Sequence, residues 1–124
     1  MTASEIAYLI AVKETAREGK GGEARSKDVA ERIGLSRASV SRAVEKLCAK
    51  RLTARTERNG VVLTEAGAAE VERYEACIAA VQKAILKRFG CRECVAKADA
   101  LRVVCALSAE NFKRLCEEEG QKCR

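Results

Sequence analysis

The sequence predicts a mainly helical protein in which a winged helix-turn-helix DNA-binding domain precedes a C-terminal helical dimerisation region. Three observations predict this fold class. The 124 residues include no proline, and the helix formers Ala, Glu, Lys, Arg and Leu dominate. A short helix, a glycine turn and a longer helix are expected over residues 26–50. A hairpin signal follows directly. We expect the DNA-binding domain over residues 1–64 and the dimerisation region over residues 65–124.

The first two helices are predicted from caps and apolar spacing. A first helix is expected over residues 4–18, with Ser4 as its cap and apolar residues on one side. The glycine-rich stretch at residues 19–22 should end it. Ser26 is then expected to cap a short helix over residues 27–33. These elements would supply the scaffold of the domain.

The next helix carries the strongest pattern. Gly34 suits a left-handed turn, and Ser36 is expected to cap a helix that runs to about Lys50. Its apolar residues recur at helical spacing and should face the core, away from any ligand. They are Val40, Ala43, Val44 and Leu47. The opposite face would therefore be exposed.

A wing and three further helices complete the predicted chain. β-prone segments flank Asn59-Gly60, which is a strong signal for a two-stranded hairpin. Thr64 should cap a long helix over residues 65–89 that ends at Gly90. Two shorter helices are expected over residues 92–107 and 108–119. We expect the first helix, the long helix and these two shorter helices to expose more apolar surface than one copy can bury, and so to form a homodimer.

Positive charge is concentrated in one segment. Between Arg32 and Arg58 there are eight basic residues and two acidic ones, so this segment carries the whole net charge of +6. A basic stripe of this kind is typical of a surface that binds phosphates. On charge alone, an ordinary solvated face explains the stripe equally well.

The motif indicates which side chains would contact double-stranded DNA. The N-terminal residues of the second helix of a helix-turn-helix reach base edges in the major groove. Wing arginines reach the minor groove or phosphates, and nearby lysines contact phosphates. The expected contacts are Ser36, Arg37, Ala38, Ser39, Ser41 and Arg42 on the helix, Arg55 and Arg58 on the wing, and Lys27, Lys46 and Lys50 on phosphates.

Two strings in the sequence resemble a known family. The string from Ser26 to Leu47, SKDVAERIGLSRASVSRAVEKL, and the string NGVVLTEAG from Asn59 to Gly67 resemble the diphtheria-toxin-repressor/MntR family of metal-dependent repressors. The opening Ser4-Glu-Ile-Ala-Tyr-Leu-Ile is similar to that family's first helix, and residues 98–108 look like its dimerisation region. The resemblance implies a dimeric repressor of the short form, without an SH3-like domain. A MarR-type regulator is the alternative, because its wing often ends in a similar string.

The effector site departs from that family. The resemblance implies a divalent-metal site built from Asp, Glu and two His ligands, but this chain contains no histidine. The family's histidine positions fall at Ile78, with Cys77 beside it, and at Cys105, while a glutamate position falls at Val104. The usual Mn²⁺ or Fe²⁺ site is therefore not intact. A rebuilt site for Zn, Fe or Mn would draw on Glu5, Cys77, Cys91, Cys94 and Cys105.

Seven cysteines leave three alternatives open. Disulfides are rare in ordinary cytosol but common in hyperthermophiles, and the high Glu, Lys and Arg content with only two asparagines fits such a source. The Cys91-Arg-Glu-Cys94 spacing also suits a metal site or a thiol switch at a helix start. Simple packing suits Cys77 and Cys105 best. The disulfide candidates are Cys91, Cys94, Cys105, Cys116 and Cys123.

Together these features predict a sequence-specific, DNA-binding transcriptional regulator, in particular a repressor. The affinity of this regulator for DNA would respond to a metal or to redox state. We expect a cytoplasmic location without a membrane partner, because neither a long apolar run nor a signal-peptide pattern is present. An enzyme is not expected, because without histidine no nucleophile–histidine pair can be assembled. A chromatin protein with little sequence preference is the alternative that uses the same basic surface.

Overall fold

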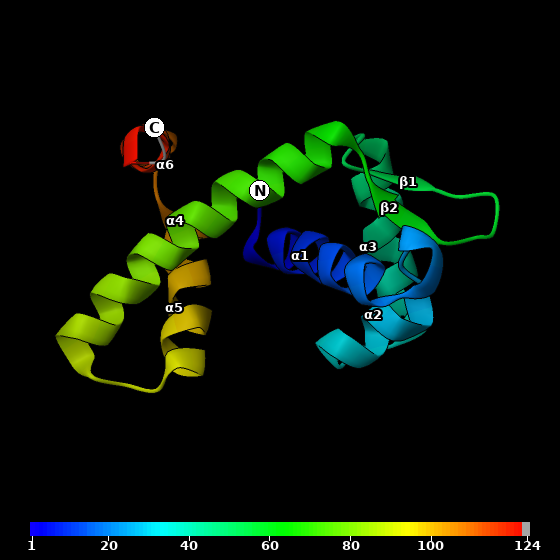
Figure 1. Ribbon diagram of the computed structural model, residues 1–124, viewed down its shortest axis with the longest axis horizontal. Coiled ribbons are helices and arrows are strands. Elements are labelled where there is room, and N and C mark those ends of the chain that lie inside the picture. Colours follow the sequence, from blue (N-terminus) through cyan, green and yellow to red (C-terminus); the bar gives the residue numbers. More distant parts are fainter. Residues whose placement is uncertain (123–124) are drawn as a thin grey trace. The chain divides into compact units, whose positions relative to one another are not determined.

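The computed structural model describes residues 1–122 and confirms the predicted fold class. The described residues are mainly helical, with one small antiparallel sheet (Figure 1). They form two compact units, one over residues 2–71 and one from Glu72 onward together with Met1. The elements are α1 (Ala3–Glu18), the 3-10 turn η1 (Lys20–Gly22), α2 (Ser26–Ile33), α3 (Arg37–Ala49), β1 (Thr53–Arg55), β2 (Val61–Leu63), α4 (Glu65–Phe89), α5 (Glu93–Ala106) and α6 (Ala109–Lys122).

The helix-turn-helix of the N-terminal unit has the predicted turn and cap. Gly34 ends α2 in the left-handed conformation, with φ of 80° and ψ of 31°. Ser36 caps α3, because its Oγ accepts a hydrogen bond from the backbone N of Ser39 at 3.1 Å. Helices α1, α2 and α3 pack around one apolar cluster. Its buried members are Ala11, Val12, Ala24, Val29, Ala30, Val40, Val44 and Val61.

Two predicted caps were wrong. Thr2, not Ser4, caps α1, and its Oγ1 accepts a hydrogen bond from the N–H of Glu5 at 3.1 Å. The sequence Thr2-x-x-Glu5 is a capping-box pattern that could have identified this start. Ser26 lies inside α2, whose cap position is Arg25 without a side-chain hydrogen bond. The chain is already fixed at Ala24 by strand-like bonds to the wing, so the helix begins one residue earlier than expected.

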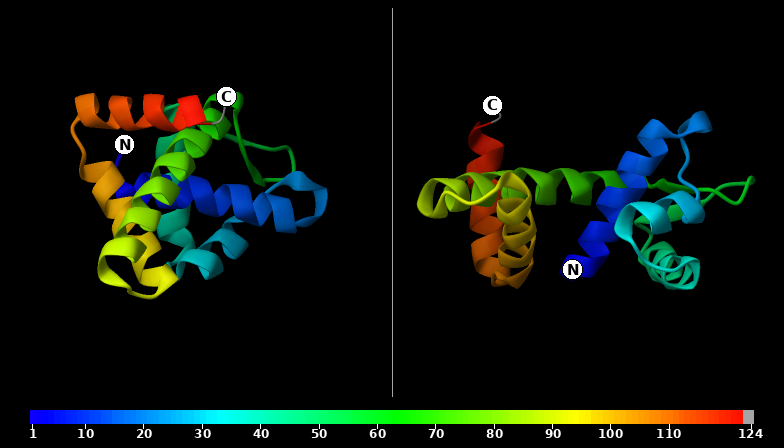
Figure 2. Two further views of the ribbon diagram at one scale, coloured as in Figure 1. Left: turned by 60° about the vertical axis from the view of Figure 1, so that its left-hand side comes forward. Right: turned by 90° about the horizontal axis from the view of Figure 1, so that it is seen from below.

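The wing is the predicted hairpin. Strands β1 and β2 pair antiparallel, with Arg55 opposite Val61. Asn59 adopts φ of 60°, and its N–H donates to the Thr56 carbonyl at 3.0 Å, which closes the turn. The wing loop projects beyond the three helices in Figure 1 and in the right view of Figure 2. An additional bridge that the sequence did not indicate joins Ala24 to Val61 through hydrogen bonds of 2.8 and 2.7 Å.

The start of α4 is fixed to the wing by the predicted Thr64 cap. Its Oγ1 accepts a hydrogen bond from the N–H of Gly67 at 3.0 Å and donates to the Arg51 carbonyl at 2.7 Å. The Thr64 N–H donates to the Leu52 carbonyl at 3.1 Å. Gly67 is buried against that same carbonyl. The first turns of α4 therefore belong to the N-terminal unit.

The second unit is formed by the rest of α4 with α5 and α6 (Figure 2). Gly90 ends α4 with φ of 64°, as predicted, and Ser108 accepts a hydrogen bond from the N–H of Asn111 at the start of α6. Tyr74 of α4 stacks on Phe112 of α6, with ring centroids 4.6 Å apart. The buried residues of this unit include Tyr74, Cys77, Ile78, Ala96, Ala100 and Val104. None of the helices in the described chain has the length and apolar character needed to cross a membrane.

Candidate nucleic-acid interface

Helix α3 separates a buried face from an exposed basic face. Val40, Val44 and Leu47 are completely buried, as predicted, and Ala43 is half-buried. The basic side chains of α3 lie on its solvent side. The exposed residues of α3 are Arg37, Ala38, Arg42, Glu45, Lys46 and Ala49, while Ser39 and Ser41 are half-buried. The core packing therefore fixes which side chains of α3 a ligand can reach.

The two predicted serines at the start of α3 are hydrogen-bonded to each other. The Ser36 Oγ accepts the backbone N–H of Ser39 and lies 3.0 Å from the Ser39 Oγ, to which it donates. The Ser39 hydroxyl can still donate its own proton to an acceptor on a ligand. Ser36 thus acts mainly as a cap, while Ser39 retains a donor on the exposed side of the helix start.

The wing presents its two predicted arginines to solvent. Arg55 ends β1, Arg58 lies in the loop, and both are exposed. The loop is held by Thr56, whose Oγ1 accepts the N–H of Gly60 at 2.9 Å. Lys27, the predicted phosphate contact of α2, is exposed as well. The wing side chains and α3 belong to the same compact unit, which is the arrangement that the helix-turn-helix motif requires.

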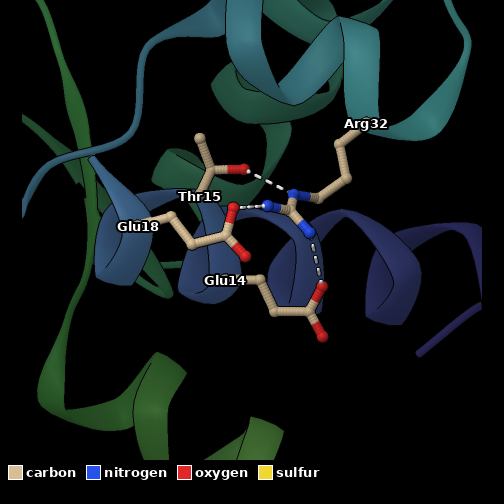
Figure 3. A network of polar contacts seen from close by, with 4 residues as sticks. All are labelled: Glu14, Thr15, Glu18 and Arg32. Carbon is tan, nitrogen blue, oxygen red and sulfur yellow. Dashed lines mark hydrogen bonds and ion pairs between the residues drawn. The ribbon is translucent and has the colours of Figure 1, made fainter.

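Arg32 is a member of the basic stripe in the sequence, but its guanidinium is bound by residues of α1. Its Nε donates to the Thr15 Oγ1 at 3.2 Å, and its guanidinium forms ion pairs with Glu14 at 3.2 Å and with Glu18 (Figure 3). All three partners lie on α1, so this network ties α2 to α1. The positive charge of Arg32 is neutralised within the protein.

Lys50, another member of the stripe, forms an ion pair with Glu5 of α1. This hydrogen bond with Lys50 lowers the pKa of the Glu5 carboxyl. The pair lies at a groove of about 730 Å³ between the start of α1 and α3. No pattern in the sequence indicated this groove. Its lining includes Thr2, Ser4, Glu5, Tyr8, Ser39, Arg42, Lys46 and Lys50.

The fold of the chain is similar to that of two solved structures. The hypothetical protein SSo2273 from Sulfolobus solfataricus matches with a TM-score of 0.72 and 21% identity, over 98% of this chain and 91% of that one. T. acidophilum IdeR matches with a TM-score of 0.68 and 19% identity, over 94% of this chain and 53% of IdeR. This chain thus spans about half the length of IdeR. The sequence matches no family model and no curated protein.

The candidate metal ligands do not gather into a site. Within residues 1–122, no group of three or more His, Cys, Asp or Glu side chains is placed to hold a metal ion. Glu5 belongs to the N-terminal unit and pairs with Lys50, whereas the candidate cysteines lie in the other unit. Without histidine, these residues do not provide the donor set of the divalent-metal site that the resemblance implied, and metal binding stays a prediction.

The described cysteines are all free thiols. Cys77 is buried, Cys91 and Cys105 are partly buried, and Cys94 is exposed. Burial raises the pKa of the Cys105 thiol. Cys123, the remaining disulfide candidate, lies outside the described residues. The structure brings together a pair that the sequence did not indicate, because the Sγ atoms of Cys77 and Cys116 are 3.5 Å apart.

Proposed function

We propose that this chain is a sequence-specific DNA-binding transcriptional regulator, in particular a repressor, that works as a homodimer in the cytoplasm. The observation that carries the proposal is the division of α3, whose inner face is buried while Arg37 and Arg42 stand exposed at its N-terminal half. An exposed N-terminal half is what a recognition helix needs in order to enter a major groove. The fold similarity to IdeR, a repressor, supports the same function.

In this proposal the side chains of the N-terminal unit have different tasks. Arg37 and Arg42 carry planar guanidinium groups that can bond guanine O6 and N7 bidentately. Ser39 and Ser41 offer hydroxyl groups to base edges or phosphates, and Ala38 offers a methyl group to thymine. Arg55 and Arg58 would enter the minor groove or grip phosphate. Lys27 and Lys46 would contact phosphates, with which a lysine ammonium interacts as a point charge.

Substitution of Arg42 by alanine tests base recognition. Arg42→Ala should weaken binding to the preferred duplex by about 1–3 kcal/mol and should change which sequence is preferred. The duplex upstream of the chain's own gene is the first to try, with a scrambled duplex of the same length beside it. Lys97→Ala is the matched control, because it removes one exposed positive charge from α5, outside the N-terminal unit. Binding is measured by fluorescence anisotropy at several salt concentrations.

The outcomes separate the two DNA-binding functions. A regulator predicts a clear preference for one duplex and a loss confined to it in Arg42→Ala. A chromatin protein predicts a steep salt dependence, no preference, and an equal loss on both duplexes. If the unmodified chain binds neither duplex at low salt, with or without added Zn²⁺, Fe²⁺ or Mn²⁺, DNA binding itself is refuted.

The dimer would form through the C-terminal unit. An apolar groove of about 470 Å³ runs between α4 and α6, and Phe89 beside it is 75% exposed. The groove is lined by Ala80, Val81, Ala84, Ile85 and Leu115, with Arg88, Glu118 and Glu119 at its edges. A second copy is the occupant we propose, because a two-fold interface is self-complementary and both charge signs are present at this groove. Light scattering at micromolar concentration should give a dimer, and Ile85→Glu should give a monomer.

The effector is part of the proposal that needs its own test. Binding to the preferred duplex should be measured before and after treatment with a chelator. Loss of DNA binding on chelation, restored by Zn²⁺, Fe²⁺ or Mn²⁺, would support a metal co-repressor. Its ligands would then include residues of a second copy or residues outside 1–122. Unchanged binding would direct the search to the thiols.

A further inference from the structure

Two cysteines that are far apart in the sequence meet in the C-terminal unit. Cys77 lies on α4 and Cys116 on α6, and their Sγ atoms are 3.5 Å apart. We propose that Cys77 and Cys116 form a reversible disulfide that links α6 covalently to α4. A disulfide has an S–S bond of about 2 Å, so the two sulfur atoms need to approach by about 1.5 Å. This inference does not depend on DNA binding.

The surrounding contacts hold the two helices in register for this bond. One helical turn before the cysteines, Tyr74 of α4 stacks on Phe112 of α6 with ring centroids 4.6 Å apart. The guanidinium carbon of Arg73 lies 5.3 Å from the centroid of the same Phe112 ring. The aromatic pair precedes the thiol pair by three residues on α4 and by four on α6. The two pairs therefore lie on the same facing sides of the helices.

The difference in exposure of the two thiols sets the order of the reaction. Cys77 is completely buried, whereas Cys116 is partly exposed. Burial, and then the hydrogen bond with Cys116, raise the pKa of the Cys77 thiol to about 12. A soluble disulfide such as oxidised glutathione would therefore react first with Cys116.

The exchange consumes one small disulfide for each bond formed. The Cys116 thiol loses its proton, its sulfur attacks oxidised glutathione, and one glutathione thiol leaves as a mixed disulfide forms. Cys77 then attacks the Cys116 sulfur, loses its proton and releases the second glutathione thiol. Two protein thiols are oxidised by two electrons in total, and one small disulfide is reduced to two thiols. An excess of dithiol reductant reverses both steps.

The bond would act on the same groove that we assign to the second copy. Cys116 follows Leu115, which lines that groove from α6, while Ala80 and Val81 line it from α4, one turn after Cys77. Oxidation would fix the two walls of the groove relative to each other. It would also close a loop of 39 residues between the linked positions, which restricts the unfolded chain.

Peptide mapping tests the pairing directly. Trypsin cleavage after Lys and Arg places every cysteine in a separate peptide, with Cys77 in residues 74–83 and Cys116 in residues 115–122. The folded full-length chain is reduced, exposed to oxidised glutathione, alkylated and digested. We expect the linked pair 74–83 with 115–122. Before alkylation, the intact oxidised chain should be lighter than the reduced chain by two hydrogen atoms, about 2 Da. Linkage of Cys91 to Cys94 alone, or alkylation of both Cys77 and Cys116, would overturn the proposal.

Thermal unfolding gives a second readout. Oxidation should raise the Tm by on the order of 10 °C, because the closed loop is long. Cys116→Ser should abolish this difference without creating a cavity in the core, since Cys116 is only partly buried. Cys94→Ser, at an exposed position, should keep it. An oxidation-dependent Tm shift that survives in Cys116→Ser would contradict the assignment, whether or not the chain binds DNA.

Discussion

Gly67 near the start of α4 offers the sharpest test of how the wing is joined to the long helix. A Cβ placed on Gly67 would lie 1.9 Å from the carbonyl oxygen of Leu52 and 2.9 Å from its carbonyl carbon. That carbonyl cannot easily move away, because it accepts the N–H of Thr64 at 3.1 Å. On the other side, the N–H of Leu52 donates to Leu47 of α3 at 3.0 Å. Gly67→Ala therefore inserts a methyl group where the backbone is held from both directions.

The magnitude follows from three opposing effects. Ordinary carbon–oxygen contacts are about 3.3 Å or longer. The new Cβ at position 67 and the carbonyl oxygen of Leu52 would therefore have to separate by about 1.4 Å. Overpacking by one methyl group costs about 1–3 kcal/mol, and the separation threatens the Thr64–Leu52 hydrogen bond, which contributes about 1 kcal/mol. Alanine gains about 1 kcal/mol over glycine in a helix. We expect Gly67→Ala to lower the free energy of unfolding by about 1–3 kcal/mol, because the loss of the hydrogen bond and the gain in helix propensity roughly cancel.

Urea unfolding followed by far-UV circular dichroism measures this difference. Gly120→Ala in α6 is the matched control, because it is a helical glycine whose added Cβ would meet nothing within 4 Å. It should gain about 0.5–1 kcal/mol from helix propensity and from a less flexible unfolded chain. If Gly67→Ala is as stable as the unmodified chain, or gains stability as Gly120→Ala does, the close approach of α4 to Leu52 is refuted.

Two further substitutions test a cap and an ion pair. Ser36→Ala should lower the free energy of unfolding by about 1 kcal/mol, because the N–H of Ser39 loses its acceptor. Ser4→Ala should change that free energy by less than about 0.5 kcal/mol. Equal effects of the two substitutions in urea unfolding would contradict the assigned caps. Lys50 lowers the pKa of the Glu5 carboxyl below its usual 4.5, so this pair stabilises the fold above that pH and stops doing so as the pH falls through the folded value. Glu5→Gln should therefore be less stable than the unmodified chain at pH 7, by under about 1 kcal/mol because the pair is partly exposed, and the gap should close as the pH falls below the folded pKa of Glu5. A gap that is constant with pH would rule out the ion pair as its source.

The sequence was sufficient for the features that depend on neighbouring residues. Gly34, Ser36 and Thr64 each act through bonds that span a few residues, and all three have the predicted role. The hairpin at Asn59-Gly60 is equally local. The apolar stripe of α3 identified its buried face, and therefore its exposed face, because a helix has a fixed period. These local rules account for the order of the elements and for the side of α3 that carries the candidate site.

The features that sequence reasoning missed are contacts between distant residues. The bridge between Ala24 and Val61 joins segments 37 residues apart, and no local pattern in the sequence indicated it. The thiol pair joins positions that are 39 residues apart, so no spacing motif such as Cys-x-x-Cys marks it. Which cysteine meets which depends on how α6 returns to α4, and neither helix carries that information alone. Only the three-dimensional arrangement separates Cys116 from the other candidates.

Contacts between distant residues also decide which positive charges of the candidate interface are available to DNA. Eight basic residues between Arg32 and Arg58 suggested a uniform stripe, yet Arg32 and Lys50 are paired with carboxylates of α1. An arginine that is already neutralised releases no counterion when DNA approaches, so it adds little to the salt dependence of binding. The sequence segment therefore contains cations of two kinds. Those that face carboxylates hold α1 against the helix-turn-helix, and those left exposed on α3 and the wing, such as Arg42 and Arg58, are the ones available to a phosphate backbone.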